Sequence, residues 1–142
     1  MPFALILAAA AAAAMPAGPV AMTPELLADL PAATASIDVH GTKLTCKGPA
    51  LANVLARIGA PQGKDLHGKA LTKAVVAHAS DGYEVLFSLG EFDATLGGTA
   101  AIVATECNGA RLSAKDGPYR LLVPGDKRPA RSVRQLQSLE IR

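Results

Sequence analysis

The chain is dominated by short stretches in which apolar and polar residues alternate, separated by turns rich in Gly, Pro, Asn and Asp. Alternation with a period of two predicts half-buried β-strands. The clearest stretch runs from 36 to 46 on both sides of His40-Gly41, and it predicts a hairpin or a bent pair of strands. Further strands are predicted over 73–79, 83–87, 100–105, 119–123 and 139–142, with turns at Asp81-Gly82 and Asn108-Gly109.

Two segments instead show signals of helices. Thr23-Pro24-Glu25 is typical of a helix start, with a capping residue, a proline at the first helical position and an early acid. This helix is predicted to run to about Leu30 and to end at Pro31. A second helix is predicted to begin at Gly48-Pro49 and to stop at 59–61, because its apolar residues recur at helical spacing. They are Leu51, Val54, Leu55 and Ile58.

A single helical turn is predicted over Leu89–Phe92, with Ser88 as its cap and Glu91 completing a capping box. Short strands therefore dominate, with a few short helices among them and no regular βαβ repeat. The predicted fold class is α+β, with a mixed, mostly antiparallel sheet or barrel-like core.

The length of 142 residues is sufficient for one domain with a substantial core. Half of the residues are apolar, but a large block of Ala lies at the N-terminus. We therefore divide the chain into a signal-like segment at 1–21, a short helix and linker at 22–35, and a domain at 36–142.

The N-terminal segment is typical of an export signal. Residues 3–15 form an uncharged apolar stretch that is too short to span a bilayer, and small residues follow it. Cleavage is predicted after Ala14, Ala17 or Ala21, although no Lys or Arg precedes the apolar stretch. The alternatives are an Ala-rich buried helix or a retained anchor. An export signal predicts a periplasmic or secreted protein that meets a membrane only through this signal.

Charge is unevenly distributed along the chain. The total of +2 gives no reason to predict nucleic-acid binding. Between 25 and 110 there are six Lys or Arg against nine Asp or Glu, whereas from 111 to 142 there are eight against three, a net of +5. The C-terminal segment is therefore a candidate surface for an anionic ligand. A solvated basic face would give the same pattern.

Cys46 and Cys107 are the two cysteines of the chain. In an oxidising compartment, an even count favours a disulfide, which would here close a loop of about 60 residues and stabilise the fold by about 4 kcal/mol. Two buried free thiols are the alternative. The residues do not form a Cys-x-x-Cys pair, so no redox or zinc motif is indicated.

Three stretches are more specific than the periodicity, and in chain order they are Lys47–Ala60, Asp81–Glu91 and Asp116–Leu136. The third contains Gly-Pro-Tyr-Arg-Leu-Leu-Val-Pro-Gly, followed by Ala-Arg-Ser-Val-Arg. In content and order these stretches resemble the molybdopterin-binding domain of the sulfite oxidase type. The resemblance covers about residues 36–142 and implies that fold.

The resemblance implies binding of molybdopterin or a similar anionic pterin phosphate. In that family the matching Ala-Arg-Ser-Val-Lys-like segment lies beside the cofactor and offers cationic side chains and backbone N–H groups to it. The corresponding residues here are Arg131, Ser132, Val133 and Arg134, with Arg at 134 where the family more often has Lys. Arg120 is a further candidate, which points either to the basic face or to solvent.

The chain also departs from the family. Catalytic members hold molybdenum through a cysteine thiolate that lies upstream of the stretch matching Lys47–Ala60. Here that place is taken by the signal-like segment and Thr23–Val39, which contain no Cys. Cys46 and Cys107 are out of register with that ligand. Much of the family's first half, including a part that encloses the pterin, is absent. No metal ligand is therefore predicted, and thiolate-anchored molybdenum catalysis is not expected.

Two functions follow from these observations. The first is an exported molybdopterin-dependent-oxidoreductase-like domain that binds a pterin or similar anionic ligand. The second is a non-enzymatic accessory module that uses the same fold to bind a redox or signalling protein partner. The sequence leaves open whether the chain is an enzyme, and it identifies no catalytic residue.

Overall fold

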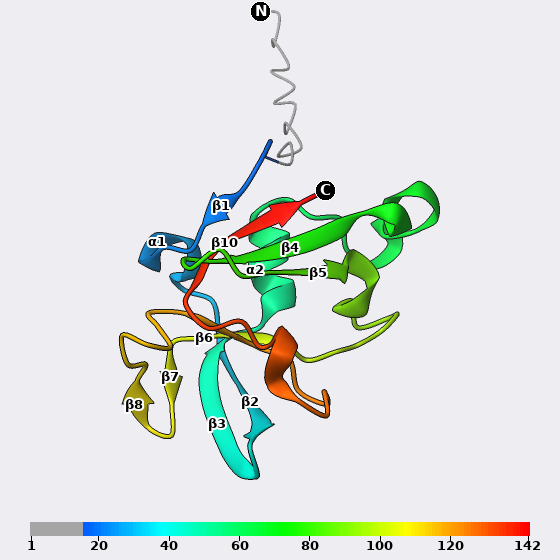
Figure 1. The fold of residues 1–142 in the computed structure, drawn as a ribbon. Helices are drawn as coiled ribbons and strands as arrows, with labels where there is room; N and C mark the ends of the chain where they lie inside the picture. Colours follow the sequence, from blue (N-terminus) through cyan, green and yellow to red (C-terminus); the bar gives the residue numbers. More distant parts are fainter. Residues whose placement is uncertain (1–15) are drawn as a thin grey trace, which may run out of the picture.

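The computed structural model describes residues 16–142 of the chain. Within that range the strands form two four-stranded sheets and one two-stranded sheet, and every paired strand is antiparallel to its neighbour. The helices are few and short. Figure 1 shows the two larger sheets at opposite ends of the molecule. The predicted α+β class with mostly antiparallel strands is confirmed.

The first sheet has the strand order β1-β10-β4-β5. Its strands are β1 (Val20–Ala21), β10 (Leu136–Ile141), β4 (Ala74–Ala79) and β5 (Glu84–Ser88). The Asp81-Gly82 turn joins β4 to β5 as the sequence predicts, and Gly82 adopts the positive φ that such a turn requires. The C-terminal strand β10 lies between β1 and β4, so the sheet joins both ends of the described chain.

The second sheet has the order β2-β3-β7-β8. Its strands are β2 (Ala32–Val39), β3 (Thr42–Pro49), β7 (Glu106–Cys107) and β8 (Ala110–Arg111). The predicted hairpin around His40-Gly41 is confirmed, and both turn residues have positive φ, as a two-residue turn between twisted strands favours. It extends further than predicted, from Ala32 to Pro49.

The two-stranded sheet pairs β6 (Ile102–Ala104) with β9 (Arg120–Leu122) between two apolar clusters. Leu121 packs in the larger cluster with residues of β4, β10 and α2, whereas Leu122 packs in the smaller cluster with residues of β2 and β3. All three residues of β9 are buried. Because both faces of β9 are covered, its backbone is held in place more firmly than that of a surface strand, and so are the positions of its side chains.

Helix α1 (Pro24–Leu27) begins as predicted, since the Thr23 hydroxyl accepts a hydrogen bond of 3.1 Å from the backbone N–H of Leu26. It ends earlier than the predicted Leu30. Helix α2 (Leu51–Arg57) also forms, but Gly48-Pro49 does not start it. Both residues belong to β3. At Gly48 this strand passes very close to β6, and a Cβ there would lie 1.9 Å from the Val103 carbonyl oxygen.

The remaining helices are short 3₁₀ turns: η1 (Gly63–Asp65), η2 (Gly68–Thr72), η3 (Leu89–Glu91) and η4 (Pro129–Arg131). The helical turn predicted after Ser88 is present as η3, but the predicted capping box is wrong. Ser88 makes no capping hydrogen bond through its side chain. The carboxylate of Glu91 instead binds Arg131, which lies far along the chain.

The N-terminal part of the described chain is integrated into the domain. Met22 and Leu27 are buried in the larger apolar cluster. β2 begins at Ala32, so the expected domain start at 36 falls inside this strand. The expected signal at 1–21 lies mostly outside the described residues. Among those described, no helix is long and apolar enough to cross a membrane.

Candidate functional site

A cavity of about 740 Å³ lies where the turns of the two larger sheets meet the segment that follows β8. Its walls come from the β2–β3 turn, the β4–β5 turn, the β7–β8 turn and residues between 115 and 134. Four of the five residues predicted to bind a cofactor line it, namely Arg120, Ser132, Val133 and Arg134. Residues that the sequence places far apart are thus brought to one opening.

The cavity is strongly cationic. Its lining includes five Lys or Arg residues against two carboxylates, a net charge of +3. The cations are Lys43, Lys115, Arg120, Arg128 and Arg134, and the carboxylates are Asp81 and Asp116. A concave surface with an excess of one charge concentrates ions of the opposite sign. This is the part of the basic C-terminal segment that can face an anionic ligand.

Arg120 lies at the base of this site. It is carried by the buried strand β9, and its side chain is only 7% exposed. Its Nε atom is buried and has no hydrogen-bond partner among the described residues. Burial lowers the pKa of the Arg120 guanidinium and the Asp116 carboxylate raises it, although an arginine keeps its charge in proteins. The group therefore remains a buried cation whose donors are incompletely used.

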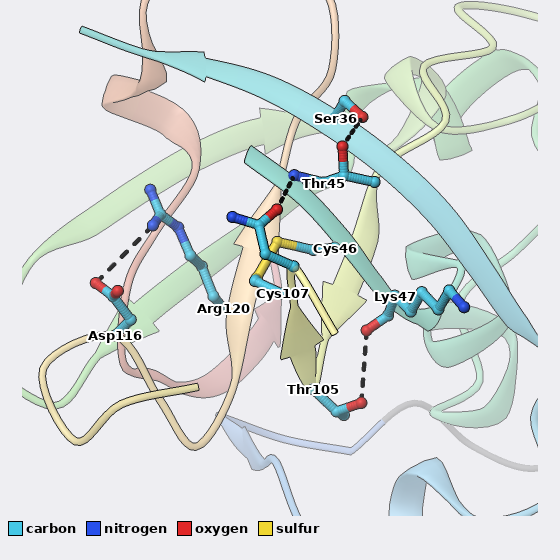
Figure 2. Close-up of a disulfide and its surroundings, with 9 residues drawn as sticks. Ser36, Thr45, Cys46, Lys47, Thr105, Cys107, Asp116 and Arg120 are labelled. Atoms are coloured by element: carbon cyan, nitrogen blue, oxygen red, sulfur yellow. Dashed lines mark hydrogen bonds and ion pairs between the residues drawn. A yellow bond between two sulfur atoms is a disulfide. The ribbon is translucent and has the colours of Figure 1, made fainter. Parts of the chain in front are cut away.

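Asp116 lies between two of the arginines. Its Oδ1 atom is 3.9 Å from Nη1 of Arg120 and also 3.9 Å from Nη1 of Arg134. Figure 2 shows the Arg120 side chain pointing toward Asp116. A distance of 3.9 Å allows electrostatic attraction but is too long for a hydrogen bond. The Asp116 carboxylate and the two guanidinium groups thus lie near one another, but the carboxylate forms no direct hydrogen bond to either arginine.

Ser132 and Val133 hold the wall of the cavity in place. The Ser132 hydroxyl accepts a buried hydrogen bond of 2.9 Å from the backbone N–H of Val123, and the Val133 carbonyl accepts one of 2.9 Å from Leu121. Both side chains are buried. These contacts bind the Arg131–Arg134 segment to the end of β9. They fix the position of the Arg134 backbone relative to Arg120.

Arg131 does not belong to this cavity. Its guanidinium donates two hydrogen bonds of 2.8 Å to the Asp126 carboxylate and another of 2.8 Å to Glu91. It also stacks over the Phe87 ring at 5.0 Å. Hydrogen bonding to Asp126 and Glu91 raises the pKa of Arg131, and the same bonding lowers the pKa of Asp126. The protein therefore supplies its own anions to Arg131, and Asp126 is engaged in this ion pair.

Cys46 and Cys107 lie opposite each other on β3 and β7 and form a disulfide with an S–S distance of 1.99 Å (Figure 2). Neither sulfur is therefore a free thiolate that could bind a metal. No group of three His, Cys, Asp or Glu side chains within residues 16–142 is placed to hold a metal ion. The next residue, Asn108, accepts a 3.2 Å hydrogen bond from the Thr45 N–H and lines the cavity.

The sequence did not identify several residues of the site. His40 comes from the β2–β3 turn and Lys43 from the start of β3. Tyr83 comes from the β4–β5 turn, and its hydroxyl donates a 2.6 Å hydrogen bond to the Ala130 carbonyl. Nothing in the local pattern at these turns indicates a ligand. Asp116 lies in the most specific stretch of the sequence, but no local pattern there places it beside Arg120 or Arg134.

No protein-family model matches this chain, and no curated protein matches it either. The function is therefore argued from the geometry and charge of the site.

Proposed function

We propose that this protein is an exported binding domain for a small anionic ligand, a phosphate-bearing molecule such as a pterin phosphate, in the cavity around Arg120. The export part of the proposal rests on the apolar stretch at residues 3–15. The observation that carries the binding part is the buried Arg120 guanidinium, which is incompletely hydrogen-bonded and opens onto a cavity with a net charge of +3.

The physical reason is the cost of burying a cation without partners. A buried polar group with an unmet hydrogen bond costs about 1–3 kcal/mol, and more when it is charged. A ligand oxyanion would supply charge-assisted acceptors to the guanidinium groups of Arg120 and Arg134 and offset part of the cost of burying the charge, although the Nε atom itself is out of its reach. The cavity volume of about 740 Å³ is within the range of small-molecule sites. The partly exposed apolar side chains of Val39 and Leu44 offer a surface for the uncharged part of such a ligand.

The residues present fit only part of a molybdenum cofactor. Arg120, Arg134 and the other lining cations suit the phosphate of a pterin. The two cysteine sulfurs of the chain are joined in the disulfide, so they do not fit a thiolate-anchored molybdenum centre. We therefore propose ligand binding without chemistry at a thiolate-held metal.

The test is a calorimetric titration of the purified protein with inorganic phosphate and with a pterin phosphate at fixed ionic strength. Replacing Arg120 by Met should weaken binding by about 10- to 100-fold, because one charge-assisted hydrogen bond contributes about 1.5–3 kcal/mol. Arg134→Met, whose side chain is 53% exposed, should weaken binding by a smaller factor. Arg134→Met also keeps the test valid if Arg120→Met fails to fold.

The matched control is Arg111→Met, which removes the same charge from an exposed position on β8 outside this cavity. It should leave binding within about twofold of the unmodified protein. Equal loss in Arg111→Met and Arg120→Met, or no binding at millimolar ligand, would contradict the proposal. Stoichiometric molybdenum in protein purified from a cofactor-producing host would contradict the absence of a held metal.

A second function, binding to a redox or signalling protein partner, is favoured by a different surface. β5 is an edge strand of its sheet, and Leu86 on this strand is 61% exposed. An exposed apolar residue on an edge strand suits the addition of a partner strand. Leu86→Lys should abolish capture of a specific partner and leave anion binding unchanged. Identical sets of captured proteins for the two forms would count against this function.

A further inference from the structure

We propose that Asp116 makes the cavity selective for an oxyanion that can carry a proton, such as a phosphate monoester, over one that cannot, such as a sulfate ester. This inference rests on the proposed function and specifies the ligand class of the same site. It arises from one feature, a carboxylate placed between two arginines that it does not bind directly.

The Asp116 carboxylate has acceptor capacity to spare. Its Oδ1 atom lies 3.9 Å from a nitrogen of each arginine, beyond hydrogen-bond distance. Within the described chain its side chain makes no hydrogen bond, although it lines the cavity and is only 33% exposed. An ionised carboxylate can accept about four hydrogen bonds and donates none. A ligand atom beside it is therefore favoured when it brings a proton.

The main chain that carries Asp116 is held by several hydrogen bonds. The Asp116 carbonyl accepts a 2.8 Å hydrogen bond from the N–H of Gln135, and its own N–H donates a 3.1 Å bond to Ser113. The Gln135 side-chain amide also donates a 2.9 Å hydrogen bond to the Ala114 carbonyl. These contacts join the loop before β9 to the residue that follows Arg134. They fix the main-chain position from which the Asp116 carboxylate reaches toward the two arginines.

The consequence is a difference between two ligands of nearly equal shape. In a singly protonated phosphate monoester, the unprotonated oxygens accept from Arg120 and Arg134 while the P–O–H donates to Asp116. A sulfate ester carries no proton at these pH values, so an oxygen near Asp116 would place two acceptors against each other. Like charges at such distances disfavour one another. Asp116 therefore lowers the affinity for the sulfate ester more than the affinity for the phosphate.

The experiment compares phenyl phosphate with phenyl sulfate, titrated calorimetrically into the full protein at pH 5.5 and constant ionic strength. A phosphate monoester loses its second proton near pH 6, so a substantial share is singly protonated at this pH. We expect phenyl phosphate to bind at least about tenfold more tightly, a difference of about 1.4 kcal/mol. Asp116→Asn should reduce that preference to about threefold or less, mainly through a gain in phenyl sulfate affinity.

The matched control is Asp65→Asn, which removes a carboxylate from an exposed position in η1, away from this cavity. It should keep the preference of the unmodified protein. A preference of less than about threefold in the unmodified protein would overturn the inference, and so would an unchanged preference in Asp116→Asn. A preference of less than about threefold would be expected if ordered water separated Asp116, Arg120 and Arg134 from the ligand.

A pH series tests the same idea without relying on the variant. Raising the pH from 5.5 to 8 should weaken phenyl phosphate relative to phenyl sulfate, because the proton that Asp116 accepts is lost. His40 also lines the cavity and faces both ligands. The other lining charges, Asp81, Lys43, Lys115 and Arg128, face both ligands alike. A preference for phosphate that rises with pH would overturn the inference.

These outcomes separate the inference from the proposed function. If both ligands bind with equal affinity and Arg120→Met abolishes both, the anion site exists and the role of Asp116 is wrong. If neither ligand binds to the unmodified protein or to Asp116→Asn, the proposed function itself fails.

Discussion

Arg131 and Arg120 belong to the same basic segment of the sequence, but the fold gives them opposite surroundings. Arg131 is 37% exposed and forms close ion pairs with Asp126 and Glu91. Arg120 is 7% exposed and has one carboxylate, Asp116, at 3.9 Å. The more accessible arginine is satisfied by the protein, whereas the less accessible one is not. A cation that lacks hydrogen-bond partners within the protein is therefore a better indication of an anion-binding site than a cation that is merely exposed.

The comparison also shows what each arginine contributes. Arg131 joins η3 to the loop before η4 and stabilises the fold. Arg120 and Arg134 form no hydrogen bond to Asp116, so we expect each to contribute less to stability than Arg131 does. Substitution of Arg131 should therefore mainly lower stability, whereas substitution of Arg120 or Arg134 should mainly weaken ligand binding.

The largest expected effect tests the region that supports the Arg120 side of the cavity. Replacing both cysteines by Ala should lower the free energy of unfolding by about 4 kcal/mol, because the disulfide closes a long loop. β3 and β7 should lose protection from hydrogen exchange before β4 and β10 do, and ligand affinity should fall, since Asn108 lines the cavity next to Cys107. Denaturant unfolding and hydrogen exchange measure these changes.

Adding a reducing agent to the double variant is the control and should change nothing further. A loss of less than about 1 kcal/mol would mean that the β3–β7 contact holds the second sheet together without the disulfide.

An intermediate effect is expected at Arg131. Arg131→Met leaves Glu91 and Asp126 without their partner and should cost about 1–2 kcal/mol, a value reduced by the partial exposure of the pair. Anion affinity should stay within about twofold, because Arg131 does not line the cavity. Arg128→Met, which removes a charge of the same sign nearby, should change stability by less than about 0.5 kcal/mol.

The stability difference at Arg131 should also depend on pH. Hydrogen bonding to Arg131 lowers the pKa of Asp126 from its ordinary value of 3.8. A lowered folded-state pKa contributes stability that is present above the unfolded value and is lost as pH falls through the folded one. The difference between the unmodified protein and Arg131→Met should therefore be constant from pH 5 to 8 and shrink below about pH 4. A difference that grows in acid would contradict the assigned pairing.

The smallest expected effect on stability is at Arg120. Arg120→Met replaces a buried, incompletely hydrogen-bonded cation by an apolar side chain of similar length. The variant should be as stable as the unmodified protein or more stable by up to about 1 kcal/mol, while its anion affinity falls. Thermal or denaturant unfolding provides the measurement. A loss of stability above about 1 kcal/mol would indicate that Arg120 has a structural role like that of Arg131.

The sequence predicts the strands well where one face of a strand is exposed. Period-two alternation identified the β2–β3 hairpin and the strands β4 and β5, because a half-buried strand must alternate. At β9 alternation left open whether Arg120 points to the basic face or to solvent, and the structure places it in the lining of the cationic cavity. Alternation did not reveal that both faces of β9 are covered, so that Arg120 is also largely buried.

Local signals failed where a distant residue competed for the same group. The capping box at Ser88 and Glu91 was a sound local interpretation, but Arg131 offers the Glu91 carboxylate a charged partner. The helix predicted to start at Gly48-Pro49 begins later, because β6 passes against Gly48. Neither competitor is adjacent in sequence, so no local pattern could have revealed it.

By itself, the sequence determined the α+β class, the main turns, the two cysteines and a C-terminal segment rich in arginine. These features depend on local periodicity and composition, which do not depend on the tertiary contacts of the chain. Only the tertiary structure decided which cations are available, because availability depends on the carboxylates that other strands bring into contact. Asp126 and Glu91 bind Arg131, and Asp116 stops short of Arg120 and Arg134. The candidate site is defined by that difference.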